Sequence, residues 1–437
     1  MQAKTVDGAL SEIGAGWFQW RLFGIFGLVW AADAMQVLAI GLTAGSIAQT
    51  FGVTVPEALQ TGTWFFVGMM VGAWGFGQLA DRYGRRTVLI FTVLLDAVFG
   101  IASAFAPDLM WLIVLRFLTG AAVGGTLPVD YALMAEFLPP TRRGRWLVAL
   151  EGFWAVGTLV IVVAAWLLTA NAVEDAWRWI FVITGTPALI GLVLRLWIPE
   201  SPYHLSRQGR GADARRVLDK MARINGRTLS EGEILAERRR RQPAWALFQG
   251  AHLRTSLLIC LVWLLVSAAY YGVFVWLPIQ LASEGFGWVR GFEFLVWLAL
   301  AQIPGYALAA WCVETVGRRA TLVGFLIASA AGCFLFTLAA DPTLIAVSLL
   351  LMSFALLGTW GAMYAYTPEL YPTELRGTGM GTAGAMARIG GLLAPSVVAA
   401  VVAVSFATAI GLFAALLALG AVATLAIRQE TRAKPLQ

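Results

Sequence analysis

Three charged residues, Asp33, Arg116 and Arg388, stand inside long apolar stretches of this 437-residue chain. A charged side chain at the centre of a bilayer costs ~2.5–3.5 kcal/mol on insertion scales, so each needs a reason. Asp33 and Arg116 could form a buried pair, because opposite charges tolerate burial better together than apart. Protonation of Asp33 would then release Arg116 and change how the helices pack, which describes a proton switch. The alternative is a static ion pair that only fixes helix register.

Arg388 has no acidic residue within one helical turn on its own stretch. A lone guanidinium suits an anionic ligand, because it binds a carboxylate through two parallel hydrogen bonds. Aromatic residues in membrane helices usually pack or anchor at interfaces. Here, however, two aromatic faces coincide with one unpaired Arg, which favours a binding site. The aromatic residues at helical spacing are Trp263 with Tyr270, and Trp360 with Tyr364, and Tyr271, Trp30 and Tyr131 could contribute.

Histidine and cysteine contribute little to the predicted chemistry. His204 and His252 lie outside the apolar stretches, so a carboxylate must carry any proton coupling, and Asp33 is the leading candidate. The three cysteines lie in or beside apolar stretches without the spacing of a metal site. We therefore expect no metal and no other cofactor. No nucleophile–base pair stands out in the loops, which disfavours an enzyme.

A charged motif with glycines, Gly77–Arg86 (GQLADRYGRR), separates two apolar stretches, and a reduced copy occupies 314–319 (ETVGRR). Asp81 and Glu314 are 233 positions apart (314 − 81), as are Gly84 and Gly317 (317 − 84). A second pair of motifs, 136–144 and 369–377, has the same offset (369 − 136 = 233). Two motifs that share one offset indicate that the chain is a duplication.

Composition identifies a membrane protein. Hydrophobic residues make up 59% of the chain and charged residues only 13%, whereas a soluble domain carries about 25% charged residues. The apolar stretches reach the ~20 residues that a helix needs to cross the hydrocarbon core. They do not alternate in polarity as strands would, so they predict helices. We count twelve spans, six on each side of a polar segment.

Basic residues follow the topology. With the first residue in the cytoplasm, 27 of the 31 Lys and Arg residues fall in cytoplasmic loops, termini or adjoining helix ends, and four do not (31 − 4): Arg116, Arg178, Arg290 and Arg388. The positive-inside rule therefore places both termini in the cytoplasm. The net charge of +6 reflects this orientation, and we expect no nucleic-acid partner.

The polar segment predicts a cytoplasmic linker. Residues 212–225 place Val217, Leu218, Met221 and Ile224 on one helical face, which is typical of an amphipathic helix at the membrane surface or against the bundle. We divide the chain into an N-terminal six-helix bundle (1–199), the linker (200–251) and a C-terminal six-helix bundle (252–437).

The motif at Gly77–Arg86 resembles the signature loop of the major facilitator superfamily almost letter for letter, and the copy at 314–319 keeps its acid-x-x-Gly-Arg-Arg part. The resemblance spans the whole chain. It implies an all-α integral membrane fold with twelve transmembrane helices in two pseudo-symmetric six-helix bundles. Such bundles rock about a midplane site and expose it to each side in turn.

Further motifs resemble one branch of the superfamily: sugar porters, organic ion transporters, synaptic vesicle proteins and bacterial niacin transporters. These motifs are 199–202 (PESP), 177–179 (WRW) and 366–373 (YTPELYPT). Asp33 and Arg116 fall where sugar porters place their coupling acid and arginine. The sequence DAM at Asp33 resembles the first-span motif of the niacin group, which has a second acid where this chain has Gln36. This departure leaves the proton stoichiometry open.

The segments 270–272 (YYG) and 387–391 (ARIGG) resemble organic ion and niacin transporters. In that comparison, position 388 is basic in anion carriers and acidic in cation carriers. The same relatives line their substrate site at positions 263, 270, 360 and 364. The resemblance therefore implies a substrate site at Arg388, Trp263, Tyr270, Tyr271, Trp360, Tyr364 and Gln36.

The resemblance also implies a cytoplasmic latch, in which charge pairs of the repeated motifs hold the two halves together. Arg143 or Arg376 is a plausible partner for Glu136 or Glu369. Alternatively, these charges only satisfy helix ends and topology. The candidate latch residues are Gly77, Asp81, Arg82, Gly84, Arg85, Arg86, Glu136, Arg143, Glu314, Gly317, Arg318, Arg319, Glu369 and Arg376.

We therefore expect a proton-coupled secondary transporter of a small organic anion, such as nicotinate or another aromatic carboxylate. Arg388 would hold the carboxylate, the aromatic residues would sandwich the ring, and Asp33 would exchange the proton against Arg116. A carrier of sugars or neutral polyols is the nearest alternative, and a membrane sensor that does not move its ligand is a more distant one. We expect a multi-pass monomer of the cell inner (plasma) membrane, whose partners are the small-molecule substrate, protons and membrane lipid.

Overall fold

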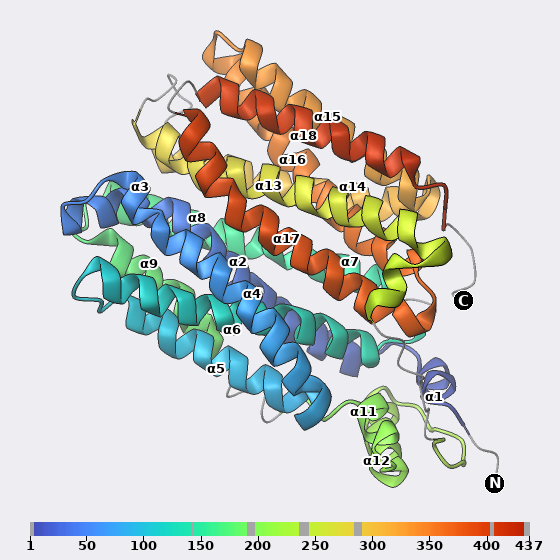
Figure 1. The fold of residues 1–437 in the computed structure, drawn as a ribbon. Coiled ribbons are helices and arrows are strands. Elements are labelled where there is room, and N and C mark those ends of the chain that lie inside the picture. The colour runs from blue at the N-terminus through green and yellow to red at the C-terminus, as the bar shows by residue number, and fades with distance from the viewer. Residues whose placement is uncertain are drawn as a thin grey trace.

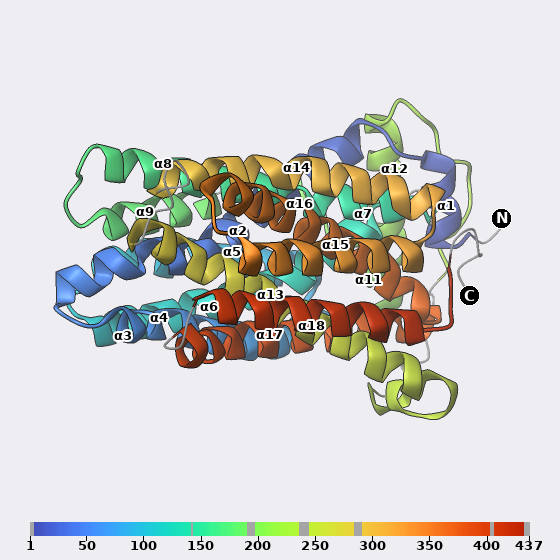
Figure 2. The same cartoon turned by 90° about the horizontal axis from the view of Figure 1, so that it is seen from above.

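The computed structural model describes residues 4–140, 143–189, 197–235, 244–283, 291–402 and 406–431. Within these ranges the chain is helical, with turns and loops between the helices and one isolated bridge between Lys4 and Ile234. The long helices run alongside one another (Figures 1 and 2) and form two groups, blue to green and yellow to red. The predicted all-helical membrane fold is confirmed.

The first group holds the N-terminal spans. The fifth of them is divided at Gly152, and a short helix, α3 (Val55–Ala58), precedes the second. The spans are α2 (Trp17–Phe51), α4 (Gln60–Tyr83), α5 (Arg85–Ser103), α6 (Leu109–Glu136), α7 with α8 (Arg143–Glu151 and Phe153–Ala170) and α9 (Ala176–Gly185).

The second group holds the C-terminal spans: α13 (Leu253–Ser283), α14 (Gly291–Thr315), α15 (Arg318–Leu338), α16 (Pro342–Tyr366), α17 (Thr373–Val402) and α18 (Phe406–Ala426). Among the described residues, nine helical segments are long and apolar enough to cross a membrane. The helices α4, α9 and α17 occupy the other predicted positions in chain order.

The connections explain where the helices end. Gly84 between α4 and α5 has φ +96°, and Gly317 between α14 and α15 has φ +125°, a region that side chains disfavour. The same tight reversal therefore occurs at equivalent places in the two repeats. At the opposite ends of the helices, Asp108 accepts a hydrogen bond from the backbone of Trp111, and Asp341 caps the start of α16 in the same way.

Glycines allow α4 and α6 to pack with their backbones in contact. A Cβ atom added at Gly72 would lie 1.9 Å from the carbonyl oxygen of Ala121, and one at Gly124 would lie 2.2 Å from that of Met69. Small residues four apart produce such close helix contacts in membranes. The N-terminal group is therefore held together by close packing of its second and fourth spans.

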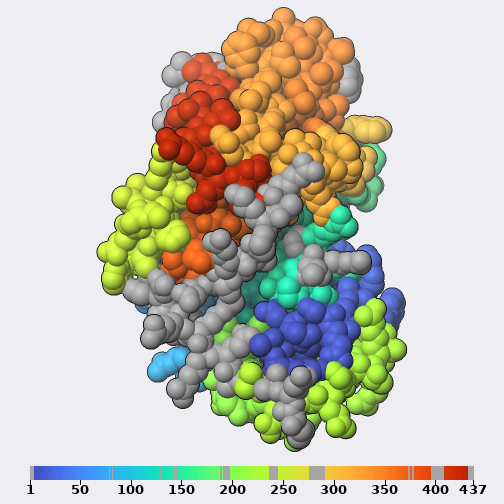
Figure 3. All heavy atoms as spheres, turned by 90° about the vertical axis from the view of Figure 1, so that its right-hand side faces the viewer, coloured from blue at the N-terminus to red at the C-terminus, as the bar shows by residue number. Residues whose placement is uncertain are grey.

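The linker folds against the N-terminal half. The predicted amphipathic helix is α12 (Gly211–Ile224), preceded by α11 (Pro202–Arg207). Its buried residues pack in one core with those of a short N-terminal helix, α1 (Val6–Ile13), which the sequence did not predict. Figure 3 shows these blue and light-green segments together at one end of the molecule. Figure 1 places the end of α18 at that same end.

A charged contact fastens the N-terminal segment to the linker. Glu12 accepts hydrogen bonds of 2.7 Å from Lys4 and of 2.7 Å from the backbone N–H of Ser230. The Lys4 ammonium, with this N–H, lowers the pKa of the Glu12 carboxyl to about 2. The carboxylate is therefore ionised at neutral pH and holds the two segments together.

In the described part of the chain the two halves meet mainly along three helix pairs, and α7 also contacts α14 and α16. The helix α13 packs against α2, α14 against α8, and α17 against α4. Each pair joins one N-terminal and one C-terminal span. Residues at these pairs are therefore candidates for a site that both halves form.

We predict that Gly72→Ala destabilises the protein, because the added methyl group would force α4 away from α6. Overpacking typically costs about 1–3 kcal/mol, and the thermal unfolding temperature in detergent should fall accordingly. Gly75→Ala on the same helix is the matched control, because a Cβ atom there meets nothing within 4 Å. Equal unfolding temperatures for the two variants would contradict the proposed close packing.

Candidate functional site

Aromatic side chains of α13 and α16 are buried against each other. The ring of Trp263 lies 5.6 Å from that of Trp360 and 4.9 Å from that of Tyr364. Tyr270 lies 5.8 Å from Trp360 and 5.1 Å from Tyr271. Trp263 and Tyr270 lie on one face of α13, and Trp360 and Tyr364 lie on one face of α16, as their helical spacing predicts. The structure thus brings all five predicted aromatic residues into one cluster.

The N-terminal half completes this cluster. The ring of Trp30 on α2 lies 6.1 Å from Tyr131 on α6, and both rings reach Tyr364, at 6.2 Å and 5.4 Å. Trp154 on α8 donates a hydrogen bond of 2.7 Å from its indole nitrogen to the Tyr270 hydroxyl. The aromatic cluster therefore joins the two halves, and any motion that separates them must open it.

Arg388 on α17 is buried, with 8% of its surface exposed. Within the described part of the chain, no carboxylate lies at ion-pair distance from its guanidinium, and its Nε has no hydrogen-bond partner. A long contact of 3.5 Å joins its Nη1 to the carbonyl oxygen of Gly384. Among the described residues, Asp33, Glu151, Tyr271 and Tyr364 lie within electrostatic reach of Arg388, and Tyr364 also shares a side-chain hydrogen bond with it.

Arg116 on α6 is held by Gln36 on α2. Its Nη2 donates a hydrogen bond of 2.8 Å to the Gln36 oxygen, and the Gln36 nitrogen donates one of 3.0 Å to Asp96 on α5. The Thr184 hydroxyl, which lies 3.0 Å from the carbonyl oxygen of Phe181, is also 3.3 Å from the Gln36 oxygen. The guanidinium lies over the ring of Phe181, 4.5 Å from its centroid. One amide thus links a cation to a carboxylate.

The suggested pair between Asp33 and Arg116 is not present in the structure. Gln36 lies almost one helical turn after Asp33 on α2 and takes the position opposite Arg116. Asp33 is buried, and its Oδ2 has no hydrogen-bond partner among the described residues. The roles of Asp33 in proton coupling and of Gln36 in substrate binding stay predictions.

Two further buried acids, Asp130 on α6 and Glu151 at the end of α7, accompany Asp33. In the described part of the chain, both carboxylate oxygens of Asp130 lack a hydrogen-bond partner. So does Oε1 of Glu151. Asp130 is within electrostatic reach of both other acids. The sequence analysis gave these two residues no role. Their presence inside apolar stretches was the available signal.

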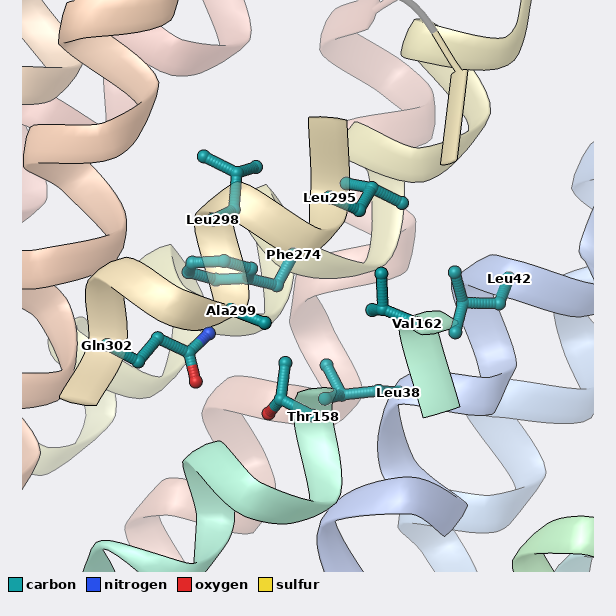
Figure 4. A pocket seen from close by; sticks show the side chains of 9 residues that line it. All are labelled: Leu38, Leu42, Thr158, Val162, Phe274, Leu295, Leu298, Ala299 and Gln302. Carbon is teal, nitrogen blue, oxygen red and sulfur yellow. The ribbon is translucent and has the colours of Figure 1, made fainter. Parts of the chain in front are cut away.

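A cavity lies beside the aromatic cluster, between the halves (Figure 4). Two polar side chains, Thr158 from α8 and Gln302 from α14, face it. The rest of the lining is apolar: Leu38, Leu42, Val162, Phe274, Leu295, Leu298 and Ala299.

Residues 54–437 match the family described as "Sugar (and other) transporter". The chain belongs to this family. It is 37% identical over 391 residues to the niacin transporter NiaP of Acinetobacter baylyi, covering 89% of this chain and 88% of the relative. It is 34% identical over 421 residues to the putative niacin/nicotinamide transporter NiaP of Bacillus subtilis, covering 96% and 98%. The synaptic vesicle 2-related protein of Xenopus laevis is 31% identical, with 99% and 82% covered.

Solved structures agree with this assignment. The proton:xylose symporter XylE bound to 6-bromo-6-deoxy-D-glucose superposes with a TM-score of 0.78 at 18% identity, covering 96% of this chain and 98% of that chain. The predicted fold of the major facilitator superfamily is confirmed. The protein is thus a multi-pass membrane transporter and not an enzyme.

The signature motifs of this transporter pair within each half. Arg85 contacts Glu136 in the N-terminal half, and Arg318 contacts Glu369 in the C-terminal half with a distance of 3.0 Å from Nε to Oε2. The partners are 51 residues apart in both cases. The two pairs are therefore equivalent contacts of the duplicated sequence.

Arg143, considered with Arg376 as a partner for Glu136 or Glu369, contacts neither of these two acids in the structure. Arg143 donates instead to Asp7 at 3.2 Å and to the Tyr203 hydroxyl at 3.3 Å, because α1 and the linker lie against it. Arg82 is exposed, and Gly77 has open space beside it. The side chains of Asp81 and Arg376 lie outside the described residues.

Two acids outside the predicted latch, Glu200 and Glu430, cap the reversals at Gly84 and Gly317. Glu430 accepts hydrogen bonds from the backbone N–H groups of Arg318 at 2.9 Å and Arg319 at 3.1 Å, and Glu200 accepts one from that of Arg86 at 3.4 Å. A carboxylate at a helix N-terminus is stabilised by the helix dipole. In the sequence, each acid follows the last span of its half and is followed by a hydroxyl residue, Ser201 or Thr431. This shared pattern could have indicated the two caps.

Arg86 and Arg319, which follow the paired arginines in the two motifs, make equivalent contacts in the two halves. Arg86 donates to the carbonyl oxygen of Ile198, and Arg319 donates to that of Leu425 at 2.6 Å. Each arginine thereby ties the reversal of its half to the end of the last span.

One predicted latch residue does join the halves. Glu314 at the end of α14 receives two hydrogen bonds from Arg145 on α7, from its Nε and its Nη2. The Arg145 side chain is 69% exposed. The contact lies at the cytoplasmic ends of the helices in the orientation that the positive-inside rule gives.

We predict that Glu314→Gln increases the population of molecules whose halves are separated at this end. Exposed ion pairs contribute little, so the population should change at most about fivefold. Spin labels on the facing ends of α7 and α14 would report the distance by electron resonance. Combining Arg145→Glu with Glu314→Arg should restore the original distances.

Glu293→Gln, at the other end of α14, is the matched control and should change nothing. An unchanged distance distribution in Glu314→Gln would show that the Arg145 contact does not hold the halves.

Proposed function

We propose that this transporter carries a small aromatic carboxylate such as nicotinate together with protons, by alternating access. The observation that supports it best is Arg388. A buried guanidinium without a carboxylate at ion-pair distance in the described residues is suited to an anion. The names of the two bacterial relatives, which refer to niacin, support the same class of substrate.

The aromatic cluster supplies the surface for a flat ring. Trp30 and Tyr131 belong to the N-terminal half, whereas Trp263 and Tyr364 belong to the C-terminal half. Residues from both halves would contact a ring held between them. Separation of the halves on one side would release it, as alternating access requires.

The buried acids near Arg388 suggest how proton and anion are coupled. Asp33 and Glu151 lie within electrostatic reach of the guanidinium. When a substrate carboxylate takes the guanidinium, a carboxylate of the protein loses its nearest cation in a buried site. A proton neutralises this stranded charge, because unpaired buried charges are costly. In this proposal Asp33 is the principal proton carrier.

A sugar carrier remains the main alternative, since the family description names sugars and the superposed structure is a xylose symporter. A neutral substrate would leave Arg388 without an anionic partner, and for this reason we favour the carboxylate. A sensor that binds without transport would show affinity but no flux.

We further propose a monomer in the plasma membrane with both termini in the cytoplasm, with 1–199 and 252–437 as the moving units. The distribution of basic residues supports this orientation. The linker would move with the N-terminal unit, because its buried residues share a core with α1 and the N-terminal spans.

Arg388→Ala should weaken equilibrium binding of nicotinate by about a hundredfold or more, because two charge-assisted hydrogen bonds are lost. Arg388→Lys should lose less, because it keeps the charge but not the planar fork. Binding can be measured by isothermal titration or by ligand-induced thermal stabilisation. If Arg388→Ala bound nicotinate as the unaltered protein does, the anion proposal would fail and the neutral-substrate alternative would gain.

Asp33→Asn should keep exchange of substrate across proteoliposome membranes but lose accumulation against a gradient. The amide occupies the same space but cannot take up and release a proton. Uptake of labelled nicotinate with and without an imposed pH gradient measures both properties. Concentrative uptake by Asp33→Asn at the rate of the unaltered protein would remove Asp33 from the coupling role.

A further inference from the structure

Gln302 on α14 is a fully buried amide whose hydrogen-bonding capacity is unused. Its exposed fraction is 0%, and within the described part of the chain neither Nε2 nor Oε1 has a hydrogen-bond partner. Most buried polar groups are paired, and an unpaired one costs about 1–3 kcal/mol. Apolar packing would be served better by Leu or Met at this position. The amide therefore needs a reason other than folding.

The amide faces the cavity between the two halves. Figure 4 shows Gln302 from α14 and Thr158 from α8 near each other on its wall, with apolar side chains around the remainder. The Thr158 hydroxyl donates its hydrogen to the carbonyl oxygen of Trp154 at 2.8 Å, so its oxygen can only accept from a further partner. The cavity thus has one polar corner, formed by one residue from each half.

This polar corner adjoins the aromatic cluster. Phe274, which lines the cavity, lies 4.9 Å from the ring of Tyr270. Trp154, one turn before Thr158, is hydrogen-bonded to Tyr270. Tyr306 lies one turn after Gln302, a rise of ~6 Å, and it is within electrostatic reach of Glu151, Tyr270, Tyr271 and Tyr364. The last two of these tyrosines are also within reach of Arg388.

We infer that Gln302 is a second polar subsite for the substrate, which donates a hydrogen bond to an acceptor atom on the part of the ring remote from the carboxylate. A pyridine nitrogen has this chemistry. The inference rests on the proposed function, because Arg388 is taken to hold the carboxylate. Separation of α8 from α14 opens the polar corner to the aromatic cluster, and the substrate then satisfies the amide that the closed cavity leaves unpaired.

The test compares two ligands that differ only in the ring acceptor, nicotinate and benzoate. We expect the unaltered protein to bind nicotinate more tightly. Gln302→Met, which keeps the volume but removes the amide, should weaken nicotinate binding about tenfold and leave benzoate binding within twofold. Gln302→Leu serves as a second variant if the first does not fold. Leu298→Met alters the same cavity without removing a polar group and should keep the ratio of the two affinities.

Equal weakening of both ligands by the Gln302 variants, or no change for either, would overturn the subsite. A different result would contradict the proposed function: Arg388→Ala would then bind nicotinate and benzoate as tightly as the unaltered protein does. Nicotinamide keeps the ring nitrogen without the carboxylate and extends the comparison. Loss of nicotinamide binding in Gln302→Met but not in Arg388→Ala would support the subsite even if the carboxylate proposal fails.

Discussion

The electrostatics of one buried guanidinium govern the candidate substrate site. A charge inside a membrane protein is stable only when something compensates for the water that it has lost. At Arg388 the compensation is diffuse, since the nearby acids and tyrosine hydroxyls act on it without a close ion pair in the described residues. Arg116 shows the opposite solution, with direct hydrogen bonding to Gln36. The two arginines are therefore compensated in different ways, and this difference is why we propose Arg388, and not Arg116, as the ligand-binding cation.

The charged contacts at the motif reversals stabilise each half internally. The pairs of Arg85 with Glu136 and of Arg318 with Glu369 each lie within one half, as do the acids that cap the helix ends. These contacts, together with the glycine packing of α4 on α6, favour movement of each half as a unit. In the described residues, the contacts between the halves are of another kind and include aromatic rings, a tryptophan–tyrosine hydrogen bond and an exposed ion pair.

The sequence predicted much of the fold and part of the site. The repeat offset and the apolar stretches were sufficient for two six-helix halves, and helical spacing was sufficient for the faces of α13 and α16. The partner of Arg116 was not predictable, because it depends on how α2, α5 and α6 are rotated and staggered. Trp154 is one of 19 tryptophans, and nothing in the sequence distinguishes it. Gln302 was not predictable from the sequence, because one uncharged amide barely alters the hydropathy of its span.

The pairing of Arg145 with Glu314 has a consequence for how the transport cycle responds to the cell interior. This contact bridges the two units that part in the proposed alternating-access cycle, and the Arg145 side chain is largely in water. Mobile ions screen such a contact over a Debye length of about 8 Å at physiological ionic strength. In the proposed orientation this face meets the cytosol, so parting the units there would become easier as the ionic strength of the cytosol rises. When a cell loses water, the higher ionic strength would weaken the contact between Arg145 and Glu314. The buried Arg388 would be affected much less, because mobile ions do not reach it.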